Sequence, residues 1–188
     1  GFNANEPLLL VLGGSQGAER LNNFILENLE LIIRDFQVLH QVGNKNYLDY
    51  KNQWEFITKN WSDLEKNRYR FQAFFEKDFS SALAAADLVL ARAGAGTIFE
   101  LAAAGKPAIL VPIAESANNH QKQNAYFYSG TGAALVIEEE NLLGNLVTEE
   151  MNKLIANPAE LQKMAGAARS FYRPDSAAII AKHLLTYV

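Results

Sequence analysis

The alternation of short apolar runs with helical patterns is the feature that most constrains how this chain can fold. Six runs have the character of strands: residues 8–12, 36–39, 69–73, 88–91, 107–111 and 133–137. Helical spacing or helix start and stop signals mark the segments between and after them: residues 18–33, 47–60, 79–86, 97–104, 119–129, 148–156, 158–171 and 175–187. This order predicts an α/β fold, a Rossmann-like parallel sheet of about six strands with helices on both faces and a helical C-terminal tail.

Length and composition indicate one globular domain. The chain has 188 residues, of which 20% are charged and 49% are hydrophobic. A single domain typically has about 100–200 residues, so we treat residues 1–188 as one domain. The chain starts at Gly1 and not at Met, and we expect it to be a piece excised from a longer protein.

Several classes of function are disfavoured by residues that the sequence lacks. There is no cysteine, which excludes disulfides, cysteine-held zinc and a thiol nucleophile. The net charge of −4 disfavours a nucleic-acid partner, and no apolar run is long enough for a transmembrane segment. His120 has no partner at metal-ligand spacing and no Asp-x-Asp pair occurs. We therefore predict neither a metal site nor a cofactor.

The loop after the first predicted strand has the composition of an anion-binding loop. In parallel sheets of this kind, ligands bind beyond the carboxyl ends of the strands, where the strand order reverses. Gly14, Ser15, Gln16 and Gly17 lie between that strand and a helix whose first N–H groups are free to bind phosphate. The loop lacks the Gly-Lys-Ser/Thr of a Walker A loop and the glycine spacing of a dinucleotide fingerprint. A tight turn that binds nothing is the alternative.

The loop after the fourth predicted strand offers a second candidate. Gly94 and Gly96 allow the backbone to approach a ligand closely. Thr97 and Glu100 have the spacing of a capping box, in which each side chain bonds the backbone N–H of the other. Alternatively, the Glu100 carboxylate accepts hydrogen bonds from the vicinal hydroxyls of a ribose. Arg92 either contacts a phosphate or forms an exposed ion pair.

Two further loops carry candidate binding residues. Near the start of the predicted helix 119–129, Gln121 and Asn124 lie three residues apart on one face, with His120 beside them. Amide side chains both donate and accept, as sugar hydroxyls require, although a polar first helical turn explains them equally well. The segment with Phe75 and Glu76 follows the third strand. Its aromatic side chains either wall a base pocket or belong to the core.

Together these loops resemble the MurG family. The matching motifs are, in order, Gly-Gly-Ser-Gln-Gly-Ala at 13–18, Arg-Ala-Gly-Ala-Gly-Thr at 92–97, Glu-Leu-Ala-Ala-Ala-Gly-Lys-Pro at 100–107, Val-Pro at 111–112 and His-Gln-Lys-Gln-Asn-Ala at 120–125. The resemblance covers about residues 8–137. Gly96 departs from the family pattern, because many members carry Leu at that position.

The resemblance implies a particular architecture and particular residue roles. Family members have two Rossmann-like domains facing a cleft, the GT-B arrangement, and this chain looks like the C-terminal donor-binding domain without the N-terminal acceptor domain. By position, Ser15 and its loop would face the diphosphate of UDP, and Glu100 would hold the ribose. The backbone around Phe75 and Glu76 would read the uracil. Gln121 and Asn124 would contact the hydroxyls of N-acetylglucosamine (GlcNAc), beside His120.

The resemblance also implies the chemistry and the partners. MurG-family members transfer GlcNAc from UDP-GlcNAc to undecaprenyl-diphospho-muramoyl-pentapeptide (lipid I), making lipid II for peptidoglycan. The transfer would be inverting and metal-independent, with no catalytic residue assigned in this domain, and the isolated piece would be inactive. The implied location is cytoplasmic, peripheral at the inner face of the membrane, with the membrane contacted through the missing domain.

Two other functions compete with this interpretation. The chain could be a naturally separate, non-catalytic donor-binding subunit of a split membrane-associated glycosyltransferase. It could also be a nicotinamide-dependent oxidoreductase, but the fingerprint loop is lacking, and the second strand ends in His40-Gln41 with no acidic residue.

Overall fold

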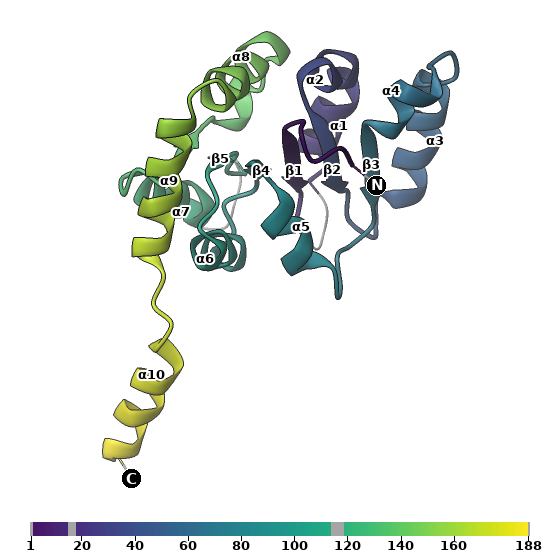
Figure 1. Cartoon of the computed structure of the whole chain (residues 1–188). Coiled ribbons are helices and arrows are strands. Elements are labelled where there is room, and N and C mark those ends of the chain that lie inside the picture. The colour runs from purple at the N-terminus through teal and green to yellow at the C-terminus, as the bar shows by residue number, and fades with distance from the viewer. Residues whose placement is uncertain (1, 15–17, 114–118, 188) are drawn as a thin grey trace.

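A single six-stranded parallel sheet organises the chain (Figure 1). The computed structural model describes residues 2–14, 18–113 and 119–187. Within them the strands run in the order β3-β2-β1-β4-β5-β6, and every described pairing is parallel. Their bounds are β1 Leu8–Leu12, β2 Gln37–Gln41, β3 Tyr69–Gln72, β4 Leu88–Ala91, β5 Ala108–Leu110 and β6 Ala134–Val136. The predicted fold class and all six predicted strands are confirmed.

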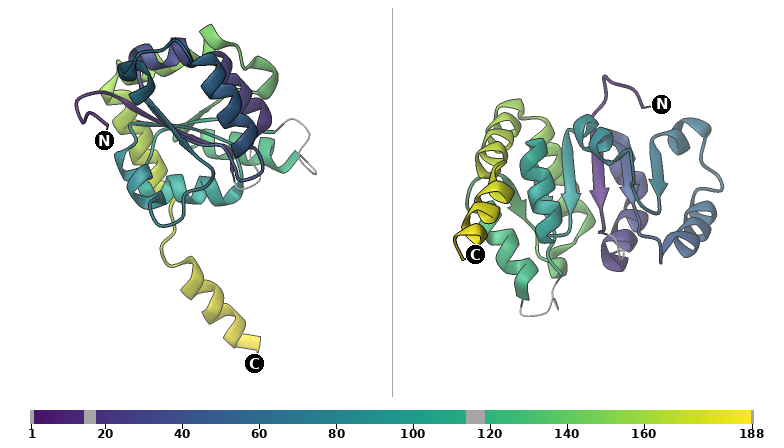
Figure 2. Two further views of the ribbon diagram at one scale, coloured as in Figure 1. Left: turned by 90° about the vertical axis from the view of Figure 1, so that its right-hand side faces the viewer. Right: turned by 90° about the horizontal axis from the view of Figure 1, so that it is seen from below.

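Helices cover both faces of the sheet, as two further views show (Figure 2). The α-helices are α1 Glu19–Glu27, α2 Leu29–Asp35, α3 Tyr47–Ile57, α4 Asp63–Asn67, α5 Phe79–Ala85, α6 Ala95–Ala104, α7 His120–Ser129, α8 Gly144–Ile155, α9 Pro158–Phe171 and α10 Ser176–Leu184. Two short 3₁₀ helices are η2 Glu139–Asn141 and η3 Leu185–Tyr187. Buried residues of α1, α2, α3 and α8 pack on one face, and those of α5, α6 and α7 pack on the other.

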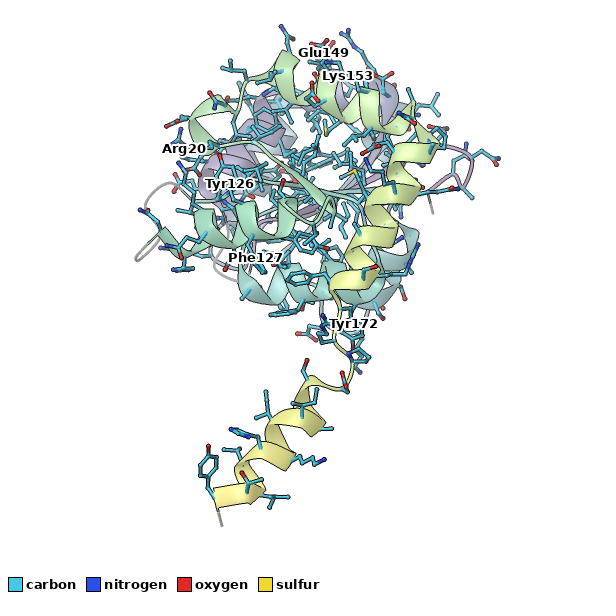
Figure 3. The ribbon with its side chains drawn as sticks, turned by 90° about the vertical axis from the view of Figure 1, so that its left-hand side faces the viewer. Arg20, Tyr126, Phe127, Glu149, Lys153 and Tyr172 are labelled. Carbon is cyan, nitrogen blue, oxygen red and sulfur yellow. The ribbon has the colours of Figure 1, made fainter. Side chains whose placement is uncertain are left out.

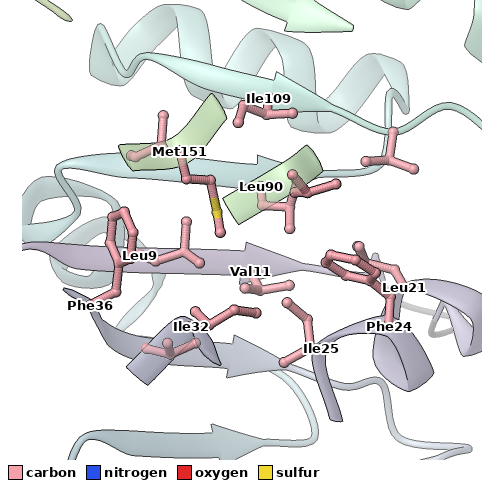
Figure 4. Close-up of a cluster of buried hydrophobic side chains, with 14 of the residues drawn as sticks. Leu9, Val11, Leu21, Phe24, Ile25, Ile32, Phe36, Leu90, Ile109 and Met151 are labelled. Atoms are coloured by element: carbon pink, nitrogen blue, oxygen red, sulfur yellow. The ribbon is translucent and has the colours of Figure 1, made fainter. Parts of the chain in front are cut away.

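The side chains of β1 alternate between two separate hydrophobic cores. Leu9 and Val11 point into the core under α1, α2 and α8, which Figure 4 shows in close-up. Leu10 and Leu12 point into the core under α5, α6 and α7. All four are buried, because successive residues of a strand face opposite sides of a sheet and both sides are covered here. An uninterrupted apolar run is therefore what a central strand of this sheet requires.

The helix predicted over residues 18–33 is wrong as a single element, because Asn28 divides it into α1 and α2. The Asn28 side chain donates to the carbonyl of Phe24 at 2.8 Å. Its backbone leaves the helical region, with φ −110° and ψ 12°. Short polar side chains compete with the helical hydrogen-bond ladder in this way. The break lies against the start of α8, where a Cβ on Gly144 would collide with Asn28.

Helix α4 was not predicted, although the sequence contains its start signal. Ser62 precedes the helix and its hydroxyl accepts from the backbone N–H of Glu65, while the Glu65 carboxylate accepts from the N–H of Ser62. This reciprocal pair is a capping box, and Ser-x-x-Glu is its sequence signature. The predicted helix over 47–60 ends at Ile57, before this second start.

Helix α10 projects away from the body of the protein, beyond Tyr172 at the end of α9 (Figures 1 and 3). Its large apolar side chains are exposed, among them Ile179, Ile180 and Leu184. The predicted helical tail is therefore confirmed, but its last helix packs on neither face of the sheet. None of the helices built from the described residues combines the length and the apolar character needed to cross a membrane.

A buried polar network fixes the protonation state of His40. Its Nε2 contacts Asn22 Oδ1 at 3.1 Å and its Nδ1 contacts the Tyr69 hydroxyl at 2.8 Å. Since the Asn22 amide nitrogen donates to the carbonyl of Val42, Asn22 Oδ1 must accept, so the proton sits on His40 Nε2. Tyr69 then donates to Nδ1 and accepts from Tyr50. Burial lowers the pKa of His40 to about 3, which keeps it neutral.

The lowered pKa of His40 predicts that folding stability falls in mild acid. In the unfolded chain a histidine titrates near 6.5, so below that pH the unfolded state binds a proton that the folded state excludes. Between pH 7 and pH 5 this costs about 2 kcal/mol of unfolding free energy. Urea unfolding at both pH values should show a fall that is larger in the wild type than in His40→Gln by about this amount. His183→Gln, on the exposed α10, should behave as the wild type; equal pH dependence in all three proteins would contradict the assignment.

Candidate functional site

The strand order reverses between β1 and β4, and a pocket opens at the carboxyl ends of the strands there. It has a volume of about 640 Å³, within the range of small-molecule sites. Its described lining comes from five segments: the end of β1 with the residues after it, the end of β2, the segment after β3, the start of α5 and the first turns of α6. The lining residues are Leu12, Gly14, Gln41, Phe74, Phe75, Glu76, Phe79, Gly96, Thr97 and Glu100.

Glycines shape the turn from β1 toward α1. Gly14 has φ +80°, a conformation that side chains other than glycine rarely adopt. A Cβ on Gly13 would lie 3.1 Å from the backbone nitrogen of Ala18 and 3.2 Å from the carbonyl oxygen of Gln41. The positive φ favours glycine at position 14, and a side chain at position 13 would require the neighbouring backbone to shift slightly. Ser15, Gln16 and Gly17, the other predicted residues of this loop, lie outside the described residues.

Helix α6 begins earlier than predicted, and this changes the role of Glu100. Gly94, not Thr97, is the N-cap residue, and no side-chain capping bond forms at this helix start among the described residues. The alternative of a capping box between Thr97 and Glu100 is therefore wrong, because Thr97 already lies inside the helix. The first N–H groups of α6, from Ala95 to Thr97, adjoin the pocket and form the positive end of the helix dipole.

The Glu100 carboxylate lies at the pocket without a partner from the part of the chain that the structure describes. Partial burial raises its pKa above the usual value, since the surrounding protein replaces water and disfavours the charged form. A carboxylate that is partly desolvated and unpaired destabilises the folded chain slightly. It can also accept hydrogen bonds from a ligand, and these would replace the hydrogen bonds to water that burial removes.

The segment after β3 closes the pocket with aromatic side chains. Phe75 is buried and belongs to the hydrophobic core, whereas Phe74 is 43% exposed. Both line the pocket, as does Glu76. Phe75 therefore belongs both to the core and to the pocket wall, whereas Phe74 belongs to the pocket wall alone. The backbone N–H of Phe75 is engaged, because it donates to Gln41 Oε1 at 3.0 Å.

Arg92 lies in a buried ion pair beside the pocket and is not part of its lining. Its guanidinium bonds the Glu139 carboxylate and donates to the carbonyl of Val111 at 3.1 Å. The side chains of Arg92 and Glu139 are only 6% and 4% exposed, so the expected exposed ion pair is in fact buried. Arg20 on α1 approaches the other Glu139 oxygen at 3.4 Å. A direct contact between Arg92 and a phosphate would require this ion pair to open.

The amide side chains of α7 hold the neighbouring loops. Gln121 Oε1 accepts from the backbone N–H of Ile113 at 3.2 Å, and the Asn124 amide donates to the carbonyl of Ala93 at 3.2 Å. His120 is the first residue of α7 and is exposed. These three residues do not appear in the described lining of the pocket. They adjoin it through the loops after β4 and β5.

The structure thus gathers part of the predicted site around one pocket. Six of the predicted residues meet there: Gly14, Phe75, Glu76, Gly96, Thr97 and Glu100. Gly94 does not line the pocket but is the N-cap residue of α6, whose first turns do. Sequence reasoning missed Gln41, although its position at the carboxyl end of a strand beside β1 was a usable signal. In the described ranges no three His, Asp or Glu side chains are grouped as metal ligands, and metal independence stays a prediction.

The parallel sheet and its covering helices define a Rossmann-like domain, and comparison with known proteins identifies its family. Residues 8–179 match the glycosyltransferase family 28 C-terminal domain. The chain therefore belongs to this family, and the resemblance to MurG seen in the motifs is confirmed.

The relatives share most of this chain. It is 38% identical over 178 residues to the UDP-N-acetylglucosamine--N-acetylmuramyl-(pentapeptide) pyrophosphoryl-undecaprenol N-acetylglucosamine transferase of Nitratidesulfovibrio vulgaris (strain DP4), covering 94% of this chain and 47% of the relative. The protein of the same name from Treponema denticola is 33% identical, covering 98% and 48%. The crystal structure of Acinetobacter baumannii MurG superposes with a TM-score of 0.78 at 27% identity, covering 98% and 51%. This chain spans about half the length of these relatives.

Replacement of Glu100 should leave folding stability intact. Because Glu100 caps nothing in the described structure, Glu100→Ala should change the unfolding free energy by no more than about 0.5 kcal/mol. Ser62→Ala is the matched control, since it removes an observed capping box and should cost about 0.5–2 kcal/mol. Denaturant unfolding of both variants measures this. A loss in Glu100→Ala as large as in Ser62→Ala would reinstate the capping role.

The buried ion pair of Glu139 should contribute far more to stability than the neighbouring surface pair. Glu139→Gln removes the carboxylate charge that pairs with the buried Arg92 guanidinium and should cost about 3–5 kcal/mol of unfolding free energy. Glu138 bonds Lys122 at 2.8 Å near the surface, where water screens the charges, so Glu138→Gln should cost much less than Glu139→Gln. Thermal and denaturant unfolding would compare them. Similar costs for the two variants would show that Arg92 does not depend on Glu139.

Proposed function

We propose that this chain is the donor-binding half of an inverting, metal-independent N-acetylglucosaminyltransferase that converts lipid I to lipid II with UDP-GlcNAc. The observation that carries the proposal is the pocket at the β1–β4 reversal, bordered by the start of α6 and by the unpaired Glu100 carboxylate. Membership of the glycosyltransferase family 28 C-terminal domain and the names of the relatives support it.

Each part of the pocket suits one part of a nucleoside diphosphate sugar. The diphosphate would lie against the loop that contains Gly14 and against the first N–H groups of α6, where the helix dipole favours negative charge. The Glu100 carboxylate would accept hydrogen bonds from the two ribose hydroxyls. Phe74 and Phe75 would flank the base, with the backbone near Glu76 at its edge.

The sugar would extend from the diphosphate toward α7. Gln121 and Asn124 would present amide groups to the GlcNAc hydroxyls, with His120 beside them. Both amides already form hydrogen bonds to the loop backbone, at Ile113 and Ala93. In the same orientation they would hold the loops and contact the sugar. Arg92 would act through the segment that it anchors, where it bonds Val111 and Glu139.

The chemistry of this half would be electrostatic. In the transfer, an acceptor hydroxyl attacks the anomeric carbon of GlcNAc while the bond to UDP breaks, and negative charge grows on the departing diphosphate. Helix N–H groups aimed at that charge stabilise the transition state more than the ground state. The acceptor, the general base and the contact with the inner face of the membrane would belong to the other half of the protein, so this chain alone would bind the donor without turnover.

Calorimetric titration with UDP-GlcNAc in EDTA tests the proposal. We expect saturable binding that EDTA does not abolish, with no heat from NADH under the same conditions. Glu100→Gln should weaken UDP-GlcNAc by about ten- to a hundredfold, because a charged acceptor is replaced by a neutral amide. Glu149→Gln, an exposed change on α8 (Figure 3), is the matched control.

The pH dependence of binding gives a second readout of Glu100. Only the ionised carboxylate accepts from both ribose hydroxyls, and burial has raised its pKa. Wild-type affinity should therefore decline with falling pH sooner than it would for an ordinary glutamate, and this component should vanish in Glu100→Gln. Full UDP-GlcNAc affinity in Glu100→Gln would refute the ribose role, and an absence of wild-type binding would refute donor binding by this chain.

A further inference from the structure

Beyond the ends of β1 and β4, the chain loses the backbone pairing that holds these two strands together. The last of these bonds among the described residues runs from the N–H of Arg92 to the carbonyl of Leu12, at 3.2 Å. After it, the N–H of Gly13 donates to the carbonyl of Gln41 on β2, whereas the Arg92 side chain donates to Val111 after β5. The two loops thus attach to opposite neighbours. The spacing between the starts of α1 and α6 therefore depends on contacts outside the sheet.

Glu139, the first residue of η2 in the segment after β6, supplies such a contact. One oxygen of its carboxylate bonds the guanidinium of Arg92, at the head of the loop that leads to α6. The other lies 3.4 Å from the guanidinium of Arg20, the second residue of α1, which Figure 3 labels. Glu139 does not appear in the described lining of the pocket, so it would act through the two arginines without touching the ligand.

The two contacts of Glu139 differ in strength. The ion pair with Arg92 is buried, and Arg92 Nε has no partner among the described residues, so in these residues Glu139 and the carbonyl of Val111 orient the guanidinium. The Arg20 side chain is 63% exposed, and an ion pair in contact with water contributes little to stability. The contact with α1 can therefore be removed by substituting Arg20 without unfolding the protein.

We propose that Glu139 is a positioning residue, which holds the starts of α1 and α6 at the spacing that a diphosphate requires. This inference rests on the proposed function, because it takes the pocket to bind a nucleoside diphosphate. A diphosphate has two linked phosphate groups that can bond both helix starts at once. A monophosphate has a single group and loses less when the spacing changes. Glu139 then raises the affinity for UDP more than the affinity for UMP.

A purely electrostatic role of Glu139 predicts a change of the opposite sign. A carboxylate near an anion site repels the ligand, so a neutral amide at position 139 would strengthen UDP. The gain would be larger for UDP than for UMP, because UDP carries more negative charge. A positioning role predicts that the same replacement weakens UDP relative to UMP. The direction of the change therefore distinguishes the two roles.

Calorimetric titration of the full chain with UDP and with UMP tests the inference, and its readout is the ratio of the two affinities. Glu139→Gln should lower the preference for UDP by about three- to tenfold, the equivalent of one hydrogen bond to phosphate. Arg20→Gln should lower it in the same direction by a smaller factor. Arg34→Gln is the matched control for Arg20, because its side chain is 65% exposed and lies 3.5 Å from Glu30 on α2. This control should keep the wild-type ratio.

Repeating the titrations at about 1 M salt removes the direct effect of charge, since the Debye length is then about 3 Å. The lower ratio in Glu139→Gln and Arg20→Gln should persist there. An unchanged or raised ratio in Glu139→Gln, with UDP binding intact, would overturn the role of Glu139. If that variant fails to fold, Arg20→Gln at 1 M salt decides, and a ratio equal to that of Arg34→Gln would overturn the inference. Absence of UDP binding by the wild type would overturn the proposed function itself.

Discussion

Parallel pairing of β1 with both β2 and β4 is the constraint on which the rest of the structure depends. It makes β1 a central strand whose side chains are all buried, and it places the reversal of strand order beside it. From β1 the chain passes to a helix on one face, and from β4 to a helix on the other. The two connections diverge, and the pocket lies where they part.

The strands were predictable from the sequence because strand burial leaves a local signal. A strand covered on both faces must be apolar throughout, so residues 8–12 could be recognised without knowledge of their neighbours. Helix ends were less predictable, since two similar four-residue signals had different outcomes. Ser62 and Glu65 form a capping box, whereas Thr97 and Glu100 do not, because Gly94 starts α6 three residues before Thr97. The position at which α6 starts decided between them, and the spacing of side chains could not indicate it.

The parts of the candidate site that come soon after a strand in the sequence could be predicted. The parts that depend on contacts between distant segments could not. The loop glycines follow strands closely and Glu100 lies in the helix that follows β4, so their place at the sheet edge came from topology alone. The ion pair of Arg92 with Glu139 joins positions 47 residues apart, and the bond from Phe75 to Gln41 joins positions 34 apart. No local pattern indicates such pairs. Both form only when β2, β3, β4 and the segment after β6 are brought together.

Hydrogen bonds of this kind also lower the entropic cost of binding a ligand at the rim of the pocket. Gln41 anchors the segment after β3, while Asn124 and Gln121 anchor the loops after β4 and β5. Folding has thus already restricted the motion of these described segments. When a ligand has to immobilise flexible side chains at a binding surface, each one costs about 0.5–1.5 kcal/mol of binding free energy. The pocket walls have therefore lost their conformational entropy on folding, before a ligand binds. More of its contact energy then remains as affinity, and its departure need not wait for the walls to rearrange.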